Sequence, residues 1–146
     1  MGWFNTDITP SSSDIFTKQE AFLGIALATS AADGVIHDAE TKNISAYLTQ
    51  MKMFDKYSER GIRDIFEKLF KVLEKEGIGG LVAIAKSSLP DDLRETAFTC
   101  AVDIAIADGV IEENENALLQ ELQQVLDISD ELGGKILDVM VIKNRA

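Results

Sequence analysis

The feature that most constrains the fold of this chain is a five-residue segment that occurs twice, 75 residues apart. Ala32-Asp33-Gly34-Val35-Ile36 recurs unchanged as Ala107-Asp108-Gly109-Val110-Ile111, and a glutamate, Glu40 or Glu115, follows each copy four residues later. Each copy comes directly after an apolar helical run, and an internal repeat of this kind decides the architecture. The sequence therefore predicts two copies of one helix–turn–helix unit, each with a pair of carboxylates at its turn.

Apolar residues recur at helical spacing along most of the chain, and no stretch shows the alternation that is typical of a strand. The pattern predicts helices over about 15–32, 38–51, 59–76, 80–88, 90–107, 113–126 and from 129 onward, with a glycine-rich break at 77–80. We therefore expect an all-α fold of the compact-bundle type. It should contain about seven helices, and an internal pseudo-twofold axis should relate its two halves.

A chain of 146 residues is the size of one ordinary domain. We expect a single helical domain over 15–146, with repeat one over about 15–75 and repeat two over about 90–146. Residues 1–14 are polar and rich in turn-forming residues, so they are expected to form a loosely held N-terminal arm.

Capping residues mark the expected starts of three helices. Thr17 and Glu20 have the spacing of a capping box, and Ser58 and Ser129 each precede an amphipathic run. The first of these helices is apolar nearly all round, which predicts a position at the centre of the fold.

Charge and composition exclude several classes of function. A net charge of −11 argues against nonspecific binding to nucleic acid, which needs a basic face. No stretch is apolar enough to predict a membrane span or a secretory signal, so no membrane insertion is expected. The single cysteine, Cys100, excludes an intramolecular disulfide and fits a reducing compartment.

The two acidic corners carry the chemistry that the sequence suggests. In each corner an aspartate ends one helix, a glycine turns the chain, and a glutamate lies in the first turn of the next helix. Clusters of carboxylate oxygens suit hard cations such as Ca²⁺, Mg²⁺ or Mn²⁺. The candidate metal ligands are Asp33, Glu40, Asp108 and Glu115, with Asp38, Asp103 and Glu113 in reserve.

A purely structural interpretation of the corners stays open. Acidic residues in a first helical turn are stabilised by the helix dipole, so duplication could have kept a good corner and nothing more. The functional interpretation is electrostatic: if both corners meet across the pseudo-twofold axis, several carboxylates share one region. Such clustering costs stability unless protons, cations or basic side chains compensate. A true EF-hand is not expected, because Thr29 and Ala31, then Ile104 and Ile106, stand where its first ligands belong.

Asp103 interrupts the apolar run of the second repeat, and Cys100 lies within that run. Asp103 stands among Val102, Ile104 and Ala105, so it is expected to be at least partly buried and to need a partner. Its counterpart in the first repeat is Ala28, so any site that uses Asp103 is asymmetric. Cys100 is interpreted as a small buried core residue.

The duplicated Ala-Asp-Gly-x-Ile-x-x-x-Glu corner in an acidic, all-helical chain resembles the TerB family, which is associated with bacterial tellurite resistance. It equally resembles the TerB-like domains of some membrane-tethered co-chaperones of the DnaJ class. The resemblance covers residues from about 18 to 142. It implies a compact helical bundle whose acidic cluster is suspected of binding divalent metal ions. It also implies a cytoplasmic stress-response role beside other stress-response proteins at the inner face of the membrane. One departure is that His37 and Glu112 replace the usual caps at the helix starts.

The first hypothesis for function is a non-enzymatic scaffold that binds or senses a divalent metal ion, with Ca²⁺, Mg²⁺, Mn²⁺ and Zn²⁺ as the candidates. The second is an acidic protein-interaction module in which metal is incidental. An enzyme is not expected, because a dinuclear carboxylate site in a helical bundle needs Glu-x-x-His pairs. The lone His37 has Gly34, and no glutamate, three residues before it.

Overall fold

The fold is taken from a computed structural model. It describes residues 16–31, 38–48, 50–106 and 113–145, without the side chains of residues 38–41, 43, 114 and 115. Within these ranges the chain is all-α and contains no strand, as predicted. The α-helices are α1 (Lys18–Ala31), α2 (Asp38–Leu48), α3 (Glu59–Ser88), α4 (Arg94–Ala105), α5 (Glu113–Val125) and α6 (Asp130–Lys143), and two 3-10 turns cover Lys52–Phe54 and Asp91–Leu93.

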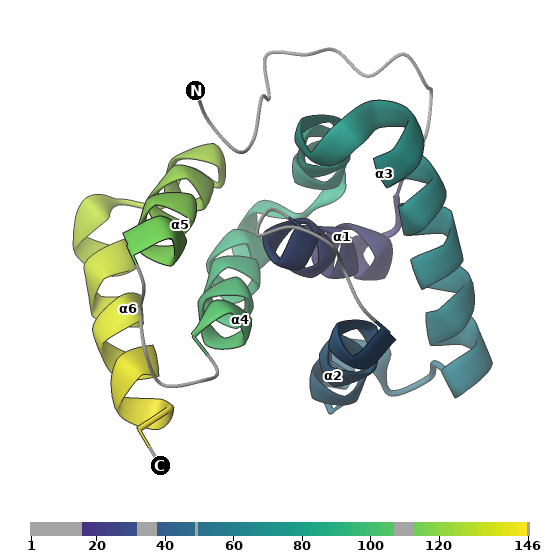
Figure 1. Cartoon of the computed structure of the whole chain (residues 1–146), viewed down its shortest axis with the longest axis horizontal. Helices are drawn as coiled ribbons and strands as arrows, with labels where there is room; N and C mark the ends of the chain where they lie inside the picture. Colours follow the sequence, from purple (N-terminus) through teal and green to yellow (C-terminus); the bar gives the residue numbers. More distant parts are fainter. Residues whose placement is uncertain (1–15, 32–37, 49, 107–112, 146) are drawn as a thin grey trace.

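Helix α1 lies at the centre of the bundle, with α3 on one side and α4 on the other (Figure 1). Every residue from Ala21 to Thr29 is buried, as is Ala31. A helix that is apolar all round is stable only when neighbours cover all its faces, and here α2, α3 and α4 do so. The central position predicted for this helix is confirmed.

The two parts of α3 fold around α1. Gly24 of α1 faces Leu69 from the first part and Leu81 and Ala85 from the second, and a Cβ built at Gly24 would lie 3.6 Å from each of them. In Figure 1 the ribbon of α3 turns back on itself at the top of the molecule, which brings both parts against α1. Apolar residues from both parts of α3 therefore pack against α1.

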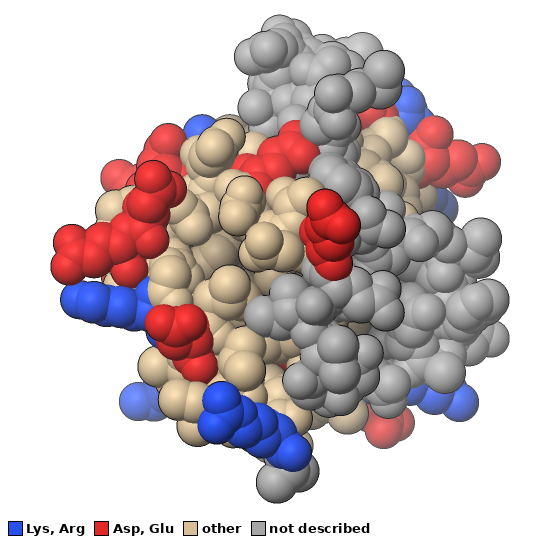
Figure 2. All heavy atoms as spheres, turned by 60° about the vertical axis from the view of Figure 1, so that its left-hand side comes forward, with Lys and Arg blue, Asp and Glu red and all other residues tan. Residues whose placement is uncertain are grey.

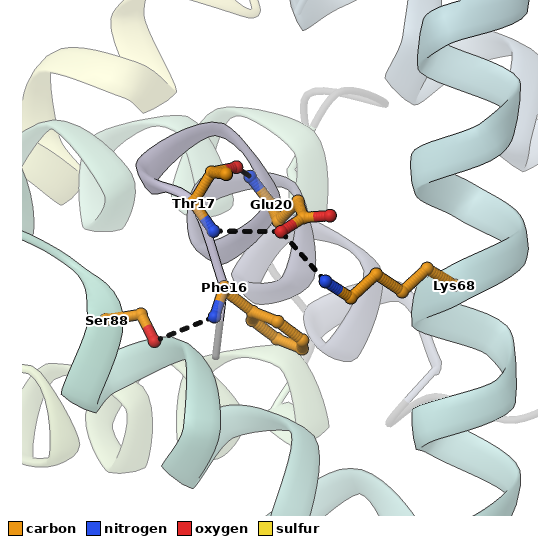
Figure 3. Close-up of polar contacts among 5 residues, drawn as sticks. All are labelled: Phe16, Thr17, Glu20, Lys68 and Ser88. Atoms are coloured by element: carbon orange, nitrogen blue, oxygen red, sulfur yellow. Dashed lines mark hydrogen bonds and ion pairs between the residues drawn. The ribbon is translucent and has the colours of Figure 1, made fainter. Parts of the chain in front are cut away.

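The start of α1 is held by the predicted capping box and by α3 (Figure 3). The Thr17 amide donates to Oε1 of Glu20 at 2.8 Å, and the Glu20 amide donates to Oγ1 of Thr17 at 3.1 Å. Lys68 Nζ lies 3.1 Å from the same Glu20 oxygen and 5.4 Å from the centre of the Phe16 ring. The Phe16 amide donates to Oγ of Ser88 at 3.3 Å. The start of α1 and the residue just before it therefore contact both parts of α3, through Lys68 in the first part and Ser88 in the second.

The caps predicted for two other helices are also present. Oγ of Ser58 accepts from the Gly61 amide at the start of α3, and Oγ of Ser129 accepts from the Leu132 amide at the start of α6. Each serine is in an extended backbone conformation, as an N-cap requires.

The prediction of seven helices is not confirmed, because residues 59–76 and 80–88 belong to one helical element. The predicted break is present inside α3 as Gly77, whose φ of 76° and ψ of 176° are not helical. Helical backbone resumes directly after it, so one residue makes the turn and no loop is needed. Six α-helices are therefore found in the described part of the chain. The pseudo-twofold relation, the division into repeats at 15–75 and 90–146 and the loose arm at 1–14 stay predictions.

Replacing Gly77 by alanine should destabilise the protein by about 1–3 kcal/mol, because this backbone region is almost restricted to glycine. No atom lies within 4 Å of a Cβ built at Gly77, so the cost would come from the backbone alone. The matched control is Gly134→Ala in α6, where the added Cβ also meets nothing within 4 Å. That change should be neutral or stabilising by up to about 1 kcal/mol, because alanine favours a helix. Equal effects of the two changes in urea unfolding would contradict the assignment of the kink to Gly77.

The second half of the chain is built on α4, which packs against α1, α5 and α6.

Among the described residues, no helix is both long and apolar enough to cross a membrane.

Candidate functional site

The residues of the two acidic corners lie mostly outside the part of the chain that the structure describes. Asp33 and Asp108 fall within 32–37 and 107–112, which are outside the described residues. After these gaps the described chain resumes in helix, with α2 described from Asp38 and α5 from Glu113. The role of the two aspartates therefore stays a prediction.

For most of the acidic residues in the first turns of α2 and α5, the structure describes the backbone and not the side chain. Glu40 belongs to α2 and Glu115 to α5, each two residues after the first residue of its helix. The side chains of Asp38, Glu40 and Glu115 are not among those described, whereas Glu113 is exposed. Carboxylates in these positions satisfy the helix dipole and can also serve as ligands, so both interpretations of the corners stay open.

Asp103 is the predicted site residue whose surroundings the structure describes in full. It is 4% exposed, and three side chains donate to its carboxylate. The Tyr47 hydroxyl donates to Oδ2 at 2.6 Å, while Asn144 Nδ2 at 2.8 Å and Lys143 Nζ at 3.2 Å both donate to Oδ1. The same Asn144 amide donates to the Met140 carbonyl at 2.9 Å. Asp103 thus joins α4 to α2 and to the end of α6, and the partner that its burial required is present.

The charge of Asp103 is stabilised by these contacts. Burial raises its pKa, but the hydrogen bonds from Tyr47, Asn144 and Lys143 and the positive charge of Lys143 outweigh burial, so the pKa is lowered below its ordinary value. Burial, and then the hydrogen bond to Asp103, raise the pKa of the Tyr47 hydroxyl well above its ordinary value. The pair is therefore a neutral phenol donating to a carboxylate, which is a short charge-assisted hydrogen bond.

Cys100 lies one helical turn before Asp103 and is buried, as predicted. Its thiol Sγ lies 3.9 Å from Sδ of Met51. Burial raises the pKa of the Cys100 thiol, so the thiol stays protonated near neutral pH. A protonated buried thiol is a poor nucleophile, which fits a core residue better than a catalytic one.

No group of three or more His, Cys, Asp or Glu side chains that could hold a metal ion occurs within the described residues. The Asp103 carboxylate accepts hydrogen bonds from three donors, one of them a cation, so it fits a structural role. The ligand roles of the corner acids stay predictions.

A hollow that the sequence did not predict lies between α4, α5 and α6. It has a volume of about 420 Å³ and is lined by Phe98, Asn116, Leu119, Gln120, Gln123, Gln124, Asp130, Gly133, Gly134 and Leu137. Gln123 is 9% exposed and donates to Oδ1 of Asp130 at 2.7 Å, and a Cβ at Gly133 would overlap its Oε1. Carboxamides dominate its polar lining, so it offers neutral hydrogen-bonding groups and lacks the carboxylate cluster that a divalent cation needs.

Comparison with known proteins identifies the family of the chain. Residues 19–133 match the model of TerB, described as tellurite resistance protein TerB. The chain belongs to the TerB family. The match spans α1 to α5 and the first turn of α6, so it includes both acidic corners of this TerB chain. No curated protein and no solved structure was found to match it.

The sequence predicted that Asp103 needs a partner, but it did not identify Tyr47, Lys143 or Asn144. These residues are 56, 40 and 41 positions away along the chain. The one available signal was the polar end of α6, where Lys143 and Asn144 follow an apolar run. The choice among many lysines and asparagines depends on how the helices of this TerB protein pack.

Proposed function

We propose that this TerB protein is a non-enzymatic scaffold that binds or senses a divalent cation, in the tellurite-resistance and stress-response setting of its family. The observation that carries the proposal is the unchanged duplication of Asp-Gly-Val-Ile with a matched glutamate, because both copies keep the same pair of acids. Asp33, Glu40, Asp108 and Glu115 are the proposed ligands, and Asp38 and Glu113 are in reserve. Carboxylate ligands of this kind suit Ca²⁺, Mg²⁺ or Mn²⁺, and Zn²⁺ is included because it also accepts carboxylates.

The packing of the described helices supports a site that is shared by both repeats. The first helices of the two repeats, α1 and α4, are in contact. The hydrogen bond from Tyr47 to Asp103 joins α2, which follows the first corner, to α4, which precedes the second corner. A cation that bridged the corners would relieve the repulsion among their carboxylates and stabilise the contact between the halves.

Thermal unfolding of chelator-treated protein, titrated with each of the four ions, tests the proposal. At an ion concentration about a hundredfold above Kd, binding should stabilise the fold by about 2.7 kcal/mol and raise Tm by roughly 8–10 °C. The double variant Asp33→Asn, Asp108→Asn should lose this rise.

The matched control for the metal titration is Asp64→Asn, Asp138→Asn, which removes the same charge from two exposed acids on α3 and α6. The control should keep the rise in Tm. A rise that persists in the corner variant, or no rise with any ion, would contradict the proposal.

The alternative is an acidic module that docks a basic stress-response protein near the inner face of the membrane, with structural corners and incidental metal. The net charge of −11 favours this function, because it attracts basic partners over a distance. The two functions respond differently to solution conditions. Partner binding that survives chelation and weakens above about 0.15 M salt would support the docking module. Binding that requires the metal would support the scaffold.

A further inference from the structure

The hollow between α4, α5 and α6 combines an apolar side with neutral polar groups. Phe98, Leu119 and Leu137 supply the apolar side chains, and the polar side chains are carboxamides and Asp130. Figure 2 turns the side with α5 and α6 toward the reader and shows a continuous uncharged area whose upper edge is bordered by acidic groups. The volume of the hollow, about 420 Å³, lies in the range of ligand sites. No lysine or arginine is among the described residues that line it, so an anion such as phosphate would find no cation there.

Two glycines of α6 keep the hollow open. Gly133 and Gly134 stand next to each other inside this helix, where glycine is less favourable than alanine. A Cβ at Gly133 would overlap Oε1 of Gln123, so this glycine makes room for a side chain of the chain itself. A Cβ at Gly134 would meet nothing within 4 Å, so no neighbour in the described chain requires a glycine there. The space beside Gly134 is therefore free for a molecule from outside.

Carboxamides of α5 line the hollow with the spacing of an extended peptide. Asn116, Gln120 and Gln124 follow one another at intervals of four residues, which correspond to a rise of about 6 Å along the helix. Two residues of an extended chain span about 6.5 Å, and every second peptide group faces the same side. Each carboxamide has donors and an acceptor, as a peptide group does. No side-chain hydrogen bond of these three residues occurs within the described part of the chain, so the row is available to a ligand.

We propose that the hollow binds an extended segment of another protein that carries a basic side chain. Asn116, Gln120 and Gln124 pair with alternate peptide groups of this segment. The basic side chain pairs with Asp130, which is exposed and accepts from Gln123 through Oδ1. The net charge of −11 attracts a basic segment over a distance. None of the described lining residues is a proposed metal ligand, so this binding goes beyond the proposed cation site.

Random seven-residue peptides displayed on phage and selected against the full chain in chelator are the probe. Enriched peptides should contain lysine or arginine, and isothermal titration with their synthetic forms measures Kd. Gly134→Leu should raise Kd by about tenfold or more, because the new side chain fills the hollow. Lys135→Leu is the matched control, because it adds the same side chain at the next position, which does not line the hollow; its Kd should change by less than about threefold. No enriched peptide, or equal Kd values for Gly134→Leu and the unchanged chain, would overturn the proposal.

Peptides with one N-methylated amide test the pairing with the carboxamides. The methyl group removes the N–H donor, so a methyl on an amide that faces α5 should raise Kd by about fivefold or more. A methyl on the amides between them should be tolerated, because these face away from α5. Gln120→Leu should remove the effect at one position, because leucine has a similar size and no hydrogen-bonding group. Equal effects at every amide, or no effect at any, would overturn the pairing. Gly134, Lys135 and Gln120 are all exposed, so thermal unfolding should show that each variant is folded.

Discussion

Replacing Phe22 by alanine is expected to lower the free energy of unfolding by about 3–5 kcal/mol, because the change removes a large ring from the centre of the bundle. Phe22 is 1% exposed and belongs to the central helix α1, whose surroundings are formed by α2, α3 and α4. The loss has two parts: the transfer free energy of the ring and the cavity that the rigid neighbours cannot fill. Because a domain of this size is stable by only about 5–15 kcal/mol, the variant should be close to unfolding at 37 °C.

Phe70→Ala is the matched control for Phe22→Ala, because it removes the same ring from a surface position. Phe70 is 36% exposed, and its ring stacks on Phe66 with 6.2 Å between the ring centres. Its loss should cost about 1 kcal/mol, mainly from that contact. Urea unfolding should show a lower midpoint at an unchanged slope for both variants. Similar midpoints for the two would mean that α1 is not the centre of the fold.

Local sequence signals predict the elements of this fold well. The apolar run from Ala21 to Thr29 has no polar face, and the structure buries all of it. The capping residues at Thr17, Ser58 and Ser129 are followed by helices as expected. These signals succeed because a cap or an uninterrupted apolar run depends on residues that are neighbours along the chain.

The predicted count of seven helices is not confirmed, because a single residue, Gly77, makes the turn inside α3. Glycine-rich sequence at 77–80 predicts a break between two helices, whereas only Gly77 leaves the helical conformation. Gly80 stays helical, and a Cβ there would lie 2.5 Å from Cβ of Glu76. Sequence composition cannot distinguish a glycine that turns the chain from one that makes room for a neighbour, because the difference depends on tertiary packing.

The candidate site is predicted only in part for the same reason. The burial of Asp103 follows from its apolar neighbours, but the donors to its carboxylate come from α2 and α6 and depend on packing over long range. The exposed side of α6 is also not predicted by the sequence, because an apolar helix at the end of a bundle is expected to be buried. The ligand roles of the corner acids rest on the repeat and on the family, and the metal titration is their test.

Replacing Asp103 by alanine is expected to lower the free energy of unfolding by about 3 kcal/mol, because it removes a buried acceptor that serves three donors. The Tyr47 hydroxyl would lose its acceptor inside the protein, whereas Lys143, whose side chain is 55% exposed, can turn to water. Asp64→Ala on the exposed side of α3 is the control and should change the free energy by less than about 0.5 kcal/mol. Equal losses for both would contradict the role assigned to Asp103.

The effect of Asp103 should depend on pH with a definite sign. Its pKa in the folded protein is lowered below the ordinary value, so the unfolded state binds the proton more tightly. The contribution to stability is therefore complete above about pH 5 and is lost as the pH falls through the ordinary pKa of about 3.9 toward the folded one. Urea unfolding at a series of pH values should show a constant difference between wild type and Asp103→Ala near neutrality. That difference should shrink below about pH 4.

Double-mutant cycles compare two of the three donors to this carboxylate, Tyr47 and Lys143. The bond from Tyr47 is short, at 2.6 Å, and partly buried, so Tyr47→Phe and Asp103→Ala should couple by about 1–2 kcal/mol. The pair with Lys143 is longer, at 3.2 Å, and lies at the surface, so Lys143→Met should couple to Asp103→Ala by less than about 1 kcal/mol. This order follows from solvent screening, which weakens an exposed ion pair much more than a buried hydrogen bond. The reverse order would mean that Asp103 is held chiefly by the charge at the end of α6, and that its hydrogen bond to Tyr47 of α2 is secondary.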